Sequence, residues 1–321
     1  MRKRRLGVLG TLVHDEIHGR TPGVGVEREW GGIAYALAGL DAALADEWEI
    51  VPLAKVGRDR AADARGLLET VRHRAPRARF VECDAPTTQV VLHYEQGERR
   101  CGGRIGGTPA WTWAELGPMV VDLDALYLNF STGEELDHAT ALALRHAFPG
   151  PIYADLHALV IDDASRPLAP DAPSWFRCFD VVQVNEAEMM RLSPDPLSLA
   201  ARVLAEGAAL LLVTVGARGT VFVAEPGFDG WPAGSALTGR VTRTLRAGAP
   251  LRTARIASME VDVVDTTGCG DVFGATACAL LLAGASIETA IGEGNRRAAR
   301  SAAYRGADGL VRHLRGELVA P

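Results

Sequence analysis

The chain carries a run of residues whose types and spacing suit the handling of a phosphate group. Asp265-Thr-Thr-Gly-Cys-Gly-Asp271 leads directly into an apolar stretch that ends at Gly284. The stretch is rich in Ala and Leu on every side, which is typical of a buried helix, and glycine is a common helix end. The β-branched residues from Val261 to Asp265 predict a buried strand ahead of the turn.

The turn between this strand and helix predicts an anion site. The first N–H groups of a helix lack intrahelical partners and carry partial positive charge. Gly268, Cys269 and Gly270 have small side chains, so an anion can approach their N–H groups. Asp271 stands beside them, where a carboxylate can accept a proton from a substrate hydroxyl during phosphoryl transfer. The alternative is a tight turn capped by Asp271, but the full motif is more specific than a bare Gly-x-Gly-Asp.

These residues resemble the signature of the ribokinase-like carbohydrate kinases, the PfkB family, whose usual pattern is Asp-Thr-x-Gly-Ala-Gly-Asp. The chain has Cys269 where the family prefers Ala, and Cys is still small and apolar. The resemblance implies that Asp271 is the catalytic base and that residues 268–270 form the anion hole. Family members often hold a monovalent cation such as K⁺ near the first Asp and Thr of this motif, so Asp265 and Thr267 are the candidates in this chain.

Two further segments are placed to meet a substrate. Leu6–Val13 predicts a strand buried on both faces, and Asp15 lies just past its end. Ligands of open α/β sheets bind at the carboxyl ends of strands, and the resemblance implies that Asp15 binds sugar hydroxyls. Gly31 and Gly32 open a predicted helix and let a ligand approach the backbone. They resemble the family's Gly-Gly-x-x-x-Asn-x-Ala element, but Ala36 replaces the usual Asn, which leaves the identity of the sugar open.

Elements of the second half resemble the nucleotide and metal site of the family. Asn185-Glu-Ala-Glu188 matches an Asn-x-x-Glu element that orients Mg²⁺, usually through water, and the ATP phosphates. Magnesium takes few carboxylates, so Glu188 with Asn185 suffices, although acidic residues also suit a helix N-terminus on dipole grounds alone. Asp155, at the end of another predicted strand, is implied to support the phosphates or magnesium. The remaining candidates beside ATP are Thr214, Gly216 and Gly219, in a Val-Thr-x-Gly-x-x-Gly hairpin, and Asn295, where family members present residues to adenine.

The order of the elements predicts an α/β fold, which the resemblance identifies as a ribokinase-like three-layer sandwich with a mainly parallel sheet flanked by helices. The 321 residues are expected to form one domain, without internal repeats. Two segments, at about 16–30 and 86–106, interrupt the strand–helix rhythm, and we expect them to combine into a small β lid that excludes water from the active site. Lids in this family often mediate dimers, so a homodimer through the lid is expected by analogy.

Composition excludes several classes of function. A net charge of −6 gives no electrostatic reason to expect nucleic acid as a partner. No apolar run has the length of a transmembrane helix, and the apolar stretch after the basic start is too short for a signal peptide, so we expect a cytoplasmic protein. The five cysteines are odd in number and include no Cys-x-x-Cys pair, which argues against a zinc site or a disulfide framework.

The function implied by the resemblance is ATP-dependent phosphorylation of a hydroxyl on a sugar or sugar-like small molecule, with Mg²⁺ as cofactor. The nearest rival is a nucleoside kinase on the same scaffold, because Ala36 removes a typical sugar contact. A non-catalytic ligand-binding relative is a rival of another class, and the retention of Asp271 argues against it. A dinucleotide-dependent oxidoreductase is disfavoured because no Gly-x-Gly-x-x-Gly follows the first strand.

Overall fold

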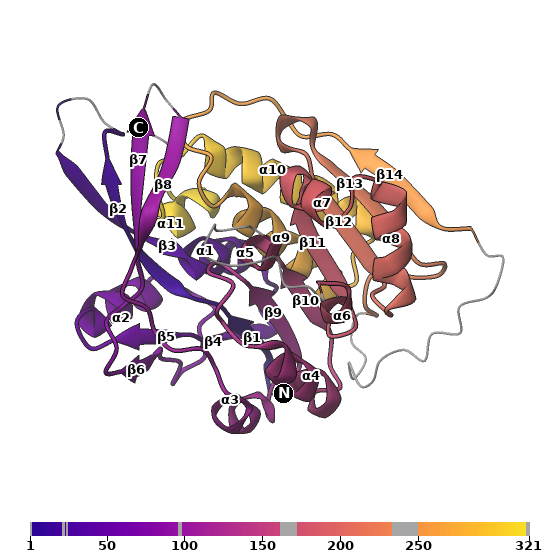
Figure 1. The fold of residues 1–321 in the computed structure, drawn as a ribbon, viewed down its shortest axis with the longest axis horizontal. Helices are drawn as coiled ribbons and strands as arrows, with labels where there is room; N and C mark the ends of the chain where they lie inside the picture. Colours follow the sequence, from indigo (N-terminus) through magenta and orange to yellow (C-terminus); the bar gives the residue numbers. More distant parts are fainter. Residues whose placement is uncertain are drawn as a thin grey trace.

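Two β-sheets with flanking helices make up the molecule, a computed structural model that describes residues 2–20, 23, 25–95, 98–160, 172–232 and 250–318 (Figure 1). The larger sheet has eight strands: β1 (Arg4–Leu9), β4 (Trp48–Leu53), β9 (Ala125–Asn129), β10 (Ile152–Asp155), β11 (Val181–Asn185), β12 (Leu210–Thr214), β13 (Thr220–Ala224) and β14 (Arg252–Ile256). Their order is β14-β13-β12-β11-β10-β9-β1-β4. The pairs from β4 to β12 are parallel, and β13 and β14 add an antiparallel edge.

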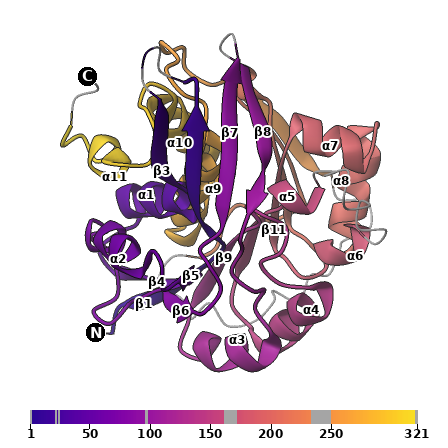
Figure 2. The ribbon, with the colours of Figure 1, turned by 60° about the vertical axis from the view of Figure 1, so that its left-hand side comes forward.

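Helices cover both faces of this sheet, as Figures 1 and 2 show. One face carries α1 (Ile33–Ala43), α2 (Ala61–Glu69), α9 (Cys269–Leu282), α10 (Ile287–Ala302) and α11 (Leu310–Leu314). The other carries α3 (Trp113–Val120), α4 (His138–Ala147), α6 (Ala172–Phe176), α7 (Glu186–Leu192) and α8 (Pro196–Ala205). Successive strand residues point to opposite faces, so Tyr127 joins the first core and its neighbours Leu126 and Leu128 join the second. The predicted three-layer α/β sandwich is confirmed.

Helix α9 is the central helix of the first layer. Ten of its 14 residues are buried, and it packs against both α1 and α10. Gly39 of α1 permits this close contact, since a Cβ there would lie 2.9 Å from the Cβ of Ala275. The helix ends next to Gly284, whose φ of 84° is the left-handed conformation that glycine adopts readily. The helical interpretation of this stretch and its predicted end therefore agree with the structure.

The strand predicted ahead of α9, over residues 261–265, is wrong, because these residues form no strand. The side chains of Val263 and Val264 are 64% and 50% exposed. The amides of Val264 and Asp265 both donate to the carbonyl of Ala302, at 2.8 and 3.0 Å. The backbone beside this segment is thus a helix end and not the edge of a sheet, and β-branched residues alone do not make a strand without such an edge.

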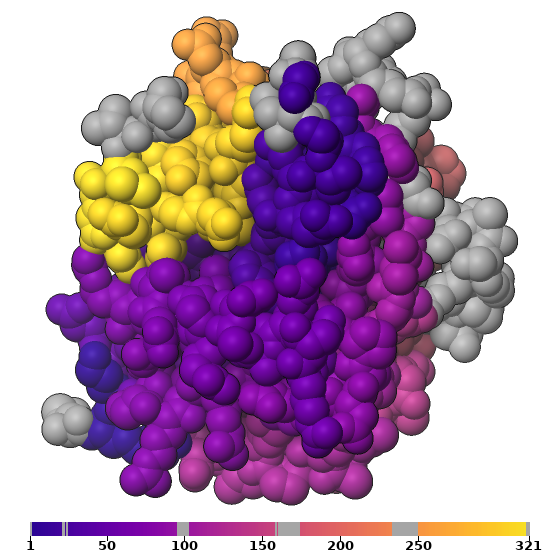
Figure 3. Space-filling model, turned by 90° about the vertical axis from the view of Figure 1, so that its left-hand side faces the viewer, coloured from indigo at the N-terminus to yellow at the C-terminus, as the bar shows by residue number. Residues whose placement is uncertain are grey.

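A second sheet of four strands stands beside the large one, and we call it the lid sheet (Figure 2). Its strands are β2 (Leu12–His18), β3 (Val26–Gly32), β7 (Gln89–Glu95) and β8 (Glu98–Ile105). They come from the two segments that interrupt the strand–helix rhythm. The order is β3-β2-β7-β8, and β2 and β7 pair in parallel although they lie far apart in the chain. Figure 3 shows the region of β2 and β3 (indigo) beside the C-terminal residues (yellow).

The lid sheet begins earlier in the chain than the sequence predicts. The single strand expected over Leu6–Val13 is two strands, because β1 ends at Leu9 and β2 starts at Leu12. Asp15 therefore lies inside a lid strand and not just past a strand of the large sheet.

The helix that was expected to open on Gly31 and Gly32 begins two residues after Gly31, at Ile33. Both glycines end β3, and Gly32 has a φ of 59°, which a right-handed helix cannot accommodate. The amide of Ile33 donates instead to the carbonyl of Thr11, at 3.0 Å. The turn of the chain into α1 is thus fixed by the lid strand next to it.

Two short strands, β5 (Lys55–Gly57) and β6 (Val81–Cys83), pair in parallel near α2. Over the part of the chain that the structure describes, no helix combines the length and apolar character that crossing a membrane requires.

Candidate active site

A cleft with a cavity volume of about 2070 Å³ lies between the lid sheet and the carboxyl ends of the central strands. Val13 and Val90 line it from the lid, and Asn185 and Thr214 line it from the ends of β11 and β12. The predicted site residues that line the cleft are Asp15, Gly32, Asp155, Asn185, Glu188, Thr214, Gly216, Gly219, Thr267, Gly268, Cys269, Gly270, Asp271 and Asn295. Segments far apart in the sequence therefore converge on one cavity.

The N-terminal turn of α9 presents backbone amides to this cleft. Gly268 has a φ of 75°, and a Cβ there would lie 2.1 Å from the ring of Tyr35, so the turn needs glycine at this position. The amide of Cys269 donates to the carbonyl of Thr266 at 3.3 Å. Within the described residues, the amides of Gly268 and Gly270 have no protein acceptor. These two donors are placed to bind an anion in the cleft.

The carboxylate of Asp271 is oriented by a buried amide. Asn129, fully buried at the end of β9, donates from Nδ2 to Oδ1 of Asp271 at 2.6 Å. Ser131 donates in turn to Oδ1 of Asn129, and the hydroxyl of Tyr127 lies 3.5 Å from the carbonyl of Asp271. Sequence reasoning assigned no role to Asn129. The signal was present, because a polar residue at the carboxyl end of a buried strand lies where α/β sheets bind ligands.

Gln183 of β11 connects the first turn of α9 to the sheet. Its Nε2 donates to Asp155 Oδ2 at 2.9 Å and to the carbonyl of Gly270 at 3.1 Å. Its Oε1 accepts a hydrogen bond from the hydroxyl of Tyr153, at 2.7 Å. Because the side chain is 2% exposed, these bonds hold the helix start firmly. Gln183 was also missed from the sequence, where it is one polar residue within an apolar strand.

Three carboxyl groups, those of Asp155, Asp271 and Glu188, lie close enough here to affect one another's protonation. Burial, followed by the negative charges of Asp271 and Glu188, raises the pKa of Asp155 well above its usual range. The carboxyl of Asp155 also accepts the amide of His157 at 3.4 Å. A cation bound nearby would relieve the repulsion among these three carboxylates.

Glu188 and Asn185 form the capping box of α7. Asn185 Oδ1 accepts the amide of Glu188 at 2.9 Å, and Glu188 Oε2 accepts the amide of Asn185 at 2.8 Å. His157 of the short helix α5 (His157–Val160) pairs with Glu188, with 2.7 Å between Nδ1 and Oε1. Burial opposes protonation of His157, but the hydrogen bond to Glu188 and the charges of Glu188 and Asp155 raise its pKa to about 9.

These side chains suit a magnesium ion that keeps several of its waters. They do not suit a metal ion whose ligands all come from the protein. No group of three or more His, Cys, Asp or Glu side chains in the described residues is arranged to hold a metal directly. Magnesium keeps several waters and is commonly bound through one or two carboxylates and substrate phosphates. Glu188 and Asp155 are the carboxylates that would hold it. Since Glu188 also caps α7, its role in a metal site stays a prediction.

On the lid side, Asp15 is 7% exposed and lines the cleft. A Cβ at Gly31 would lie 2.2 Å from Asp15 Oδ2. Gly31 therefore makes room for this carboxylate, and it does not itself line the cleft. Ala36 is fully buried in α1, so no amide side chain from this position reaches the cavity.

The expected nucleotide side of the cleft includes a 3₁₀ turn, η1 (Gly216–Arg218), after β12. Gly219 follows with a φ of 95°, and a Cβ there would lie 2.0 Å from the carbonyl oxygen of Ile256. Asn295 is 5% exposed; its Oδ1 accepts the hydroxyl of Thr220 at 2.8 Å and its Nδ2 donates to Ile256 at 2.9 Å. Its amide thus joins α10 to the antiparallel strands, and the predicted adenine contact stays a prediction.

The two residues proposed for a monovalent cation have other partners. Asp265 Oδ1 accepts the amide of Thr267 at 2.9 Å, and Asp265 Oδ2 lies 3.5 Å from Nη1 of Arg20. The hydroxyl of Thr267 lies 3.4 Å from that of Tyr94. A monovalent cation bound to Asp265 would be repelled by the permanent positive charge of Arg20, so these residues do not fit such an ion.

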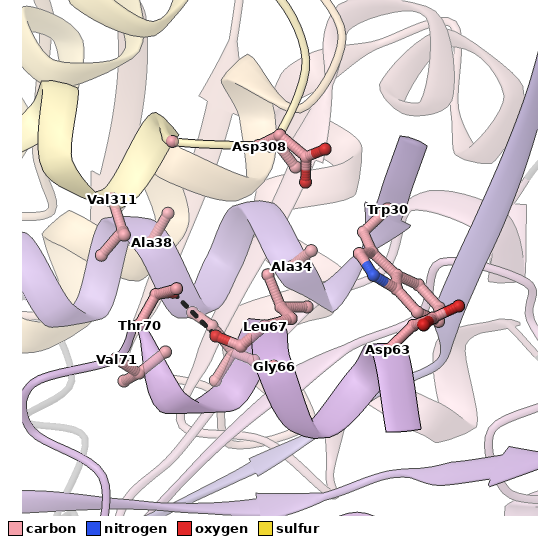
Figure 4. Close-up of a pocket in the computed structure, with 13 residues that line it drawn as sticks. Trp30, Ala34, Ala38, Asp63, Gly66, Leu67, Thr70, Val71, Asp308 and Val311 are labelled. Carbon is pink, nitrogen blue, oxygen red and sulfur yellow. Dashed lines mark hydrogen bonds between the residues drawn. The ribbon is translucent and has the colours of Figure 1, made fainter. Parts of the chain in front are cut away.

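A second, smaller cavity of about 230 Å³ lies between α1, α2 and residues 307–311 (Figure 4). Apolar side chains such as Leu67 and Val311 make up much of its lining, together with Asp63 and Asp308. None of the predicted site residues lines it, so the chemistry suggested by the sequence belongs to the large cleft.

Comparison with solved structures relates the fold to sugar and nucleoside kinases. A ribokinase from Thermotoga maritima aligns with a TM-score of 0.71 at 18% identity, covering 98% of this chain and 99% of that one. A fructokinase from Xylella fastidiosa with bound ATP aligns at 0.70 and 16%, covering 99% and 98%. A nucleoside kinase from Burkholderia thailandensis in complex with inosine aligns at 0.68 and 15%, covering 96% and 94%. Comparison with curated protein sequences finds no match.

The likeness to these structures concerns the fold. A family model, by contrast, matches the sequence itself over residues 54–313, which include the Asp265–Asp271 motif and most of the cleft. The chain belongs to the pfkB family of carbohydrate kinases.

Proposed function

We propose that this chain transfers the γ-phosphoryl group of ATP to a hydroxyl of a sugar or sugar-like small molecule, with Mg²⁺ as cofactor. The observation that carries the proposal is the start of α9, where the amides of Gly268 and Gly270 and the carboxylate of Asp271 face one large cleft. Family membership supports kinase chemistry, and the ATP bound to the Xylella fastidiosa fructokinase supports ATP as donor.

In this mechanism, Asp271 accepts the proton of the acceptor hydroxyl as that oxygen attacks the γ-phosphorus. Asn129 holds the carboxylate in place through the 2.6 Å hydrogen bond. The amides of Gly268 and Gly270, with Cys269 between them completing the predicted anion hole, stabilise the charge on the phosphoryl oxygens. Magnesium, when bound, neutralises phosphate charge near Glu188 and Asp155. Thr214, Gly216 and Gly219 lie at the end of the cleft where we place the nucleotide.

The acceptor lies, in this proposal, between Asp15 and Asp271, beneath the lid sheet. The lid strands exclude water from the reacting groups, which suppresses hydrolysis of ATP. A homodimer through the lid stays a prediction, and light scattering on the purified protein tests it.

A nucleoside is the second candidate acceptor, and the apolar lid wall favours it. Val13, Val90 and Leu92 line the cleft from the lid, and Ala36 supplies no amide for a sugar hydroxyl. Such a wall suits the face of a base as well as the carbon side of a sugar. The inosine bound to the Burkholderia thailandensis protein is consistent with this alternative on a similar fold.

The test is ADP release over a panel of ribose, fructose, fructose 6-phosphate, ketodeoxygluconate, myo-inositol, adenosine and inosine. Wild type is expected to respond to one acceptor class, and Asp271→Asn to lose about 10²–10⁴-fold in kcat, the usual contribution of a general base. Asp122→Asn, at an exposed acid outside the cleft, is the matched control. No ADP with any acceptor would point to the non-catalytic ligand-binding relative, and equal rates for wild type and Asp271→Asn would contradict the role of Asp271 as the base.

A further inference from the structure

Arg20 is a buried cation held between the lid sheet and the loop that leads into α9. Its side chain is 6% exposed and contacts three carboxylates. Nε lies 3.1 Å from Glu27 Oε2, Nη1 lies 3.1 Å from Glu29 Oε2, and Nη1 lies 3.5 Å from Asp265 Oδ2. Nη2 also bonds both glutamates. An arginine fork that meets paired carboxylates in this way is held in one orientation.

The charge at this position is permanent. Burial would lower the pKa of Arg20, but the hydrogen bonds and charges of Glu29 and Glu27 raise it above its ordinary value. Asp265 is just as buried, with 5% of its side chain exposed. Its Oδ1 holds the amide of Thr267 and its Oδ2 faces the guanidinium. Both oxygens of Asp265 are thus occupied by the protein.

The same network reaches the end of α10. A Cβ at Gly306 would lie 2.1 Å from Glu29 Oε2. The carboxylate that pairs with Arg20 therefore occupies the space beside residue 306. The amides of Val264 and Asp265 donate to the carbonyl of Ala302. Arg20 therefore links a lid hairpin, the loop before the anion hole and the end of α10, three segments that are far apart in the sequence.

We propose that the guanidinium of Arg20 takes the place of a monovalent cation beside Asp265, so that the lid itself supplies the positive charge that holds the loop before the anion-binding amides. This inference rests on the proposed function for its catalytic consequence. It predicts an enzyme that does not depend on K⁺, in contrast to the K⁺ site that the sequence resemblance implied. Arg20 acts through Asp265 and Thr267, and is a positioning residue.

The test compares wild type with Arg20→Ala in K⁺, Na⁺ and choline at equal ionic strength. Thermal unfolding is followed without substrates, and ADP release is measured with the acceptor found by the panel. Wild type is expected to show the same Tm and the same rate in all three salts. Arg20→Ala leaves three carboxylates without their cation, so it is expected to lose at least about tenfold in rate. K⁺ should recover much of that loss and raise Tm by a few degrees, because a cation can occupy the vacated position.

Further variants make the result specific. Arg28→Ala removes another lid arginine, which pairs with Glu16 at 3.0 Å and is 52% exposed, and it should show no response to K⁺. Arg20→Lys keeps the charge and should stay independent of K⁺. Arg20→Gln removes the charge but keeps a hydrogen-bonding side chain, and it replaces Arg20→Ala if the latter fails to fold. Activation of wild type by K⁺ would overturn the proposal, as would a charge-removing Arg20 variant that responds to K⁺ no more than Arg28→Ala. The Tm readout needs no turnover, so failure of the kinase assignment is distinguished from failure of this inference.

Discussion

At the scale of single residues, the protonation of His157 makes its ion pair with Glu188 sensitive to pH. Its Nδ1 lies 2.7 Å from Glu188 Oε1, and the side chain is 43% exposed. The pKa of His157 in the folded protein is about 9, against 6.5 for the free side chain. The folded state therefore holds this proton more tightly than the unfolded state does, and the difference contributes to stability.

The first prediction concerns the pH dependence of that contribution. Because the folded pKa is raised, the stabilisation by the ion pair is complete below about pH 6.5 and is lost as pH rises through about 9. The difference in the free energy of unfolding between wild type and His157→Gln should therefore shrink over this interval. Urea titrations at a series of pH values measure it, with His146→Gln, at an exposed histidine of α4, as control. A difference that stays constant from pH 6.5 to 9 would contradict the assignment of the charge to His157.

At the scale of elements, the start of α9 depends on two glycines that have different physical roles. Gly268 has a positive φ and lies against the ring of Tyr35, whereas a Cβ at Gly270 would meet no atom closer than 4.0 Å. The first glycine is required by the fold of the turn, and the second is required only if something must approach the helix start.

The second prediction separates these roles. Gly268→Ala should destabilise the protein by at least about 1–3 kcal/mol, from backbone strain alone. Gly270→Ala should leave the free energy of unfolding within about 1 kcal/mol of wild type, because alanine is favoured in helices. Its methyl group would nevertheless stand in front of the anion-binding amides, so kcat/KM for ATP should fall by about 10²-fold. Thermal unfolding and ADP release measure the two effects, and full activity of Gly270→Ala would argue against an anion at this helix start.

Elements with strong local signals were predictable from the sequence. The apolar run after Gly268 and its end at Gly284 specify α9, and the alternation of strands and helices specifies the α/β class. The strand predicted over residues 261–265 is not formed. β-branched residues indicate where a strand is favourable, but a strand forms only where the edge of another strand lies beside it, and the sequence does not reveal that edge. The lid strand that carries Asp15 was misplaced for a related reason, since β2 takes its partner from β7 far along the chain.

The parts of the site that were not predictable depend on long-range contacts. Asn129 and Gln183 act on α9 from separate strands, across 142 and 87 residues. Arg20 and Asp265 are 245 residues apart. No motif contains both partners of any of these contacts, so only the folded chain reveals them. Asn295 lines the cleft as expected, but its amide also holds neighbouring strands, so its predicted contact with adenine stays a prediction.

At the scale of the whole molecule, the cleft is bounded by two bodies that meet across it, the lid sheet and the large α/β unit. Arg104 of β8 and Glu134, which follows β9, form an ion pair across the opening, with 2.5 Å between Nη1 and Oε2. Both side chains line the cleft, and they are 35% and 32% exposed. This pair is a direct electrostatic link between the lid sheet and the body of the molecule.

The third prediction concerns this link. An exposed ion pair contributes about 0.2–1 kcal/mol, so Arg104→Glu, which replaces attraction by repulsion, should raise the KM of the acceptor by up to about fivefold. The KM of ATP should change less, because the proposal places ATP beside Thr214 and Gly216, which belong to the large α/β unit and not to the lid sheet. The charge-swapped double variant, Arg104→Glu with Glu134→Arg, should recover most of the acceptor KM, since it restores the attraction with the signs exchanged. Steady-state kinetics on wild type, both single variants and the double variant form a complete cycle. The contrary outcome is that the changes in acceptor KM of the two single variants simply add up in the double variant. In that case the two side chains do not act as a pair, and the lid is held by its other contacts.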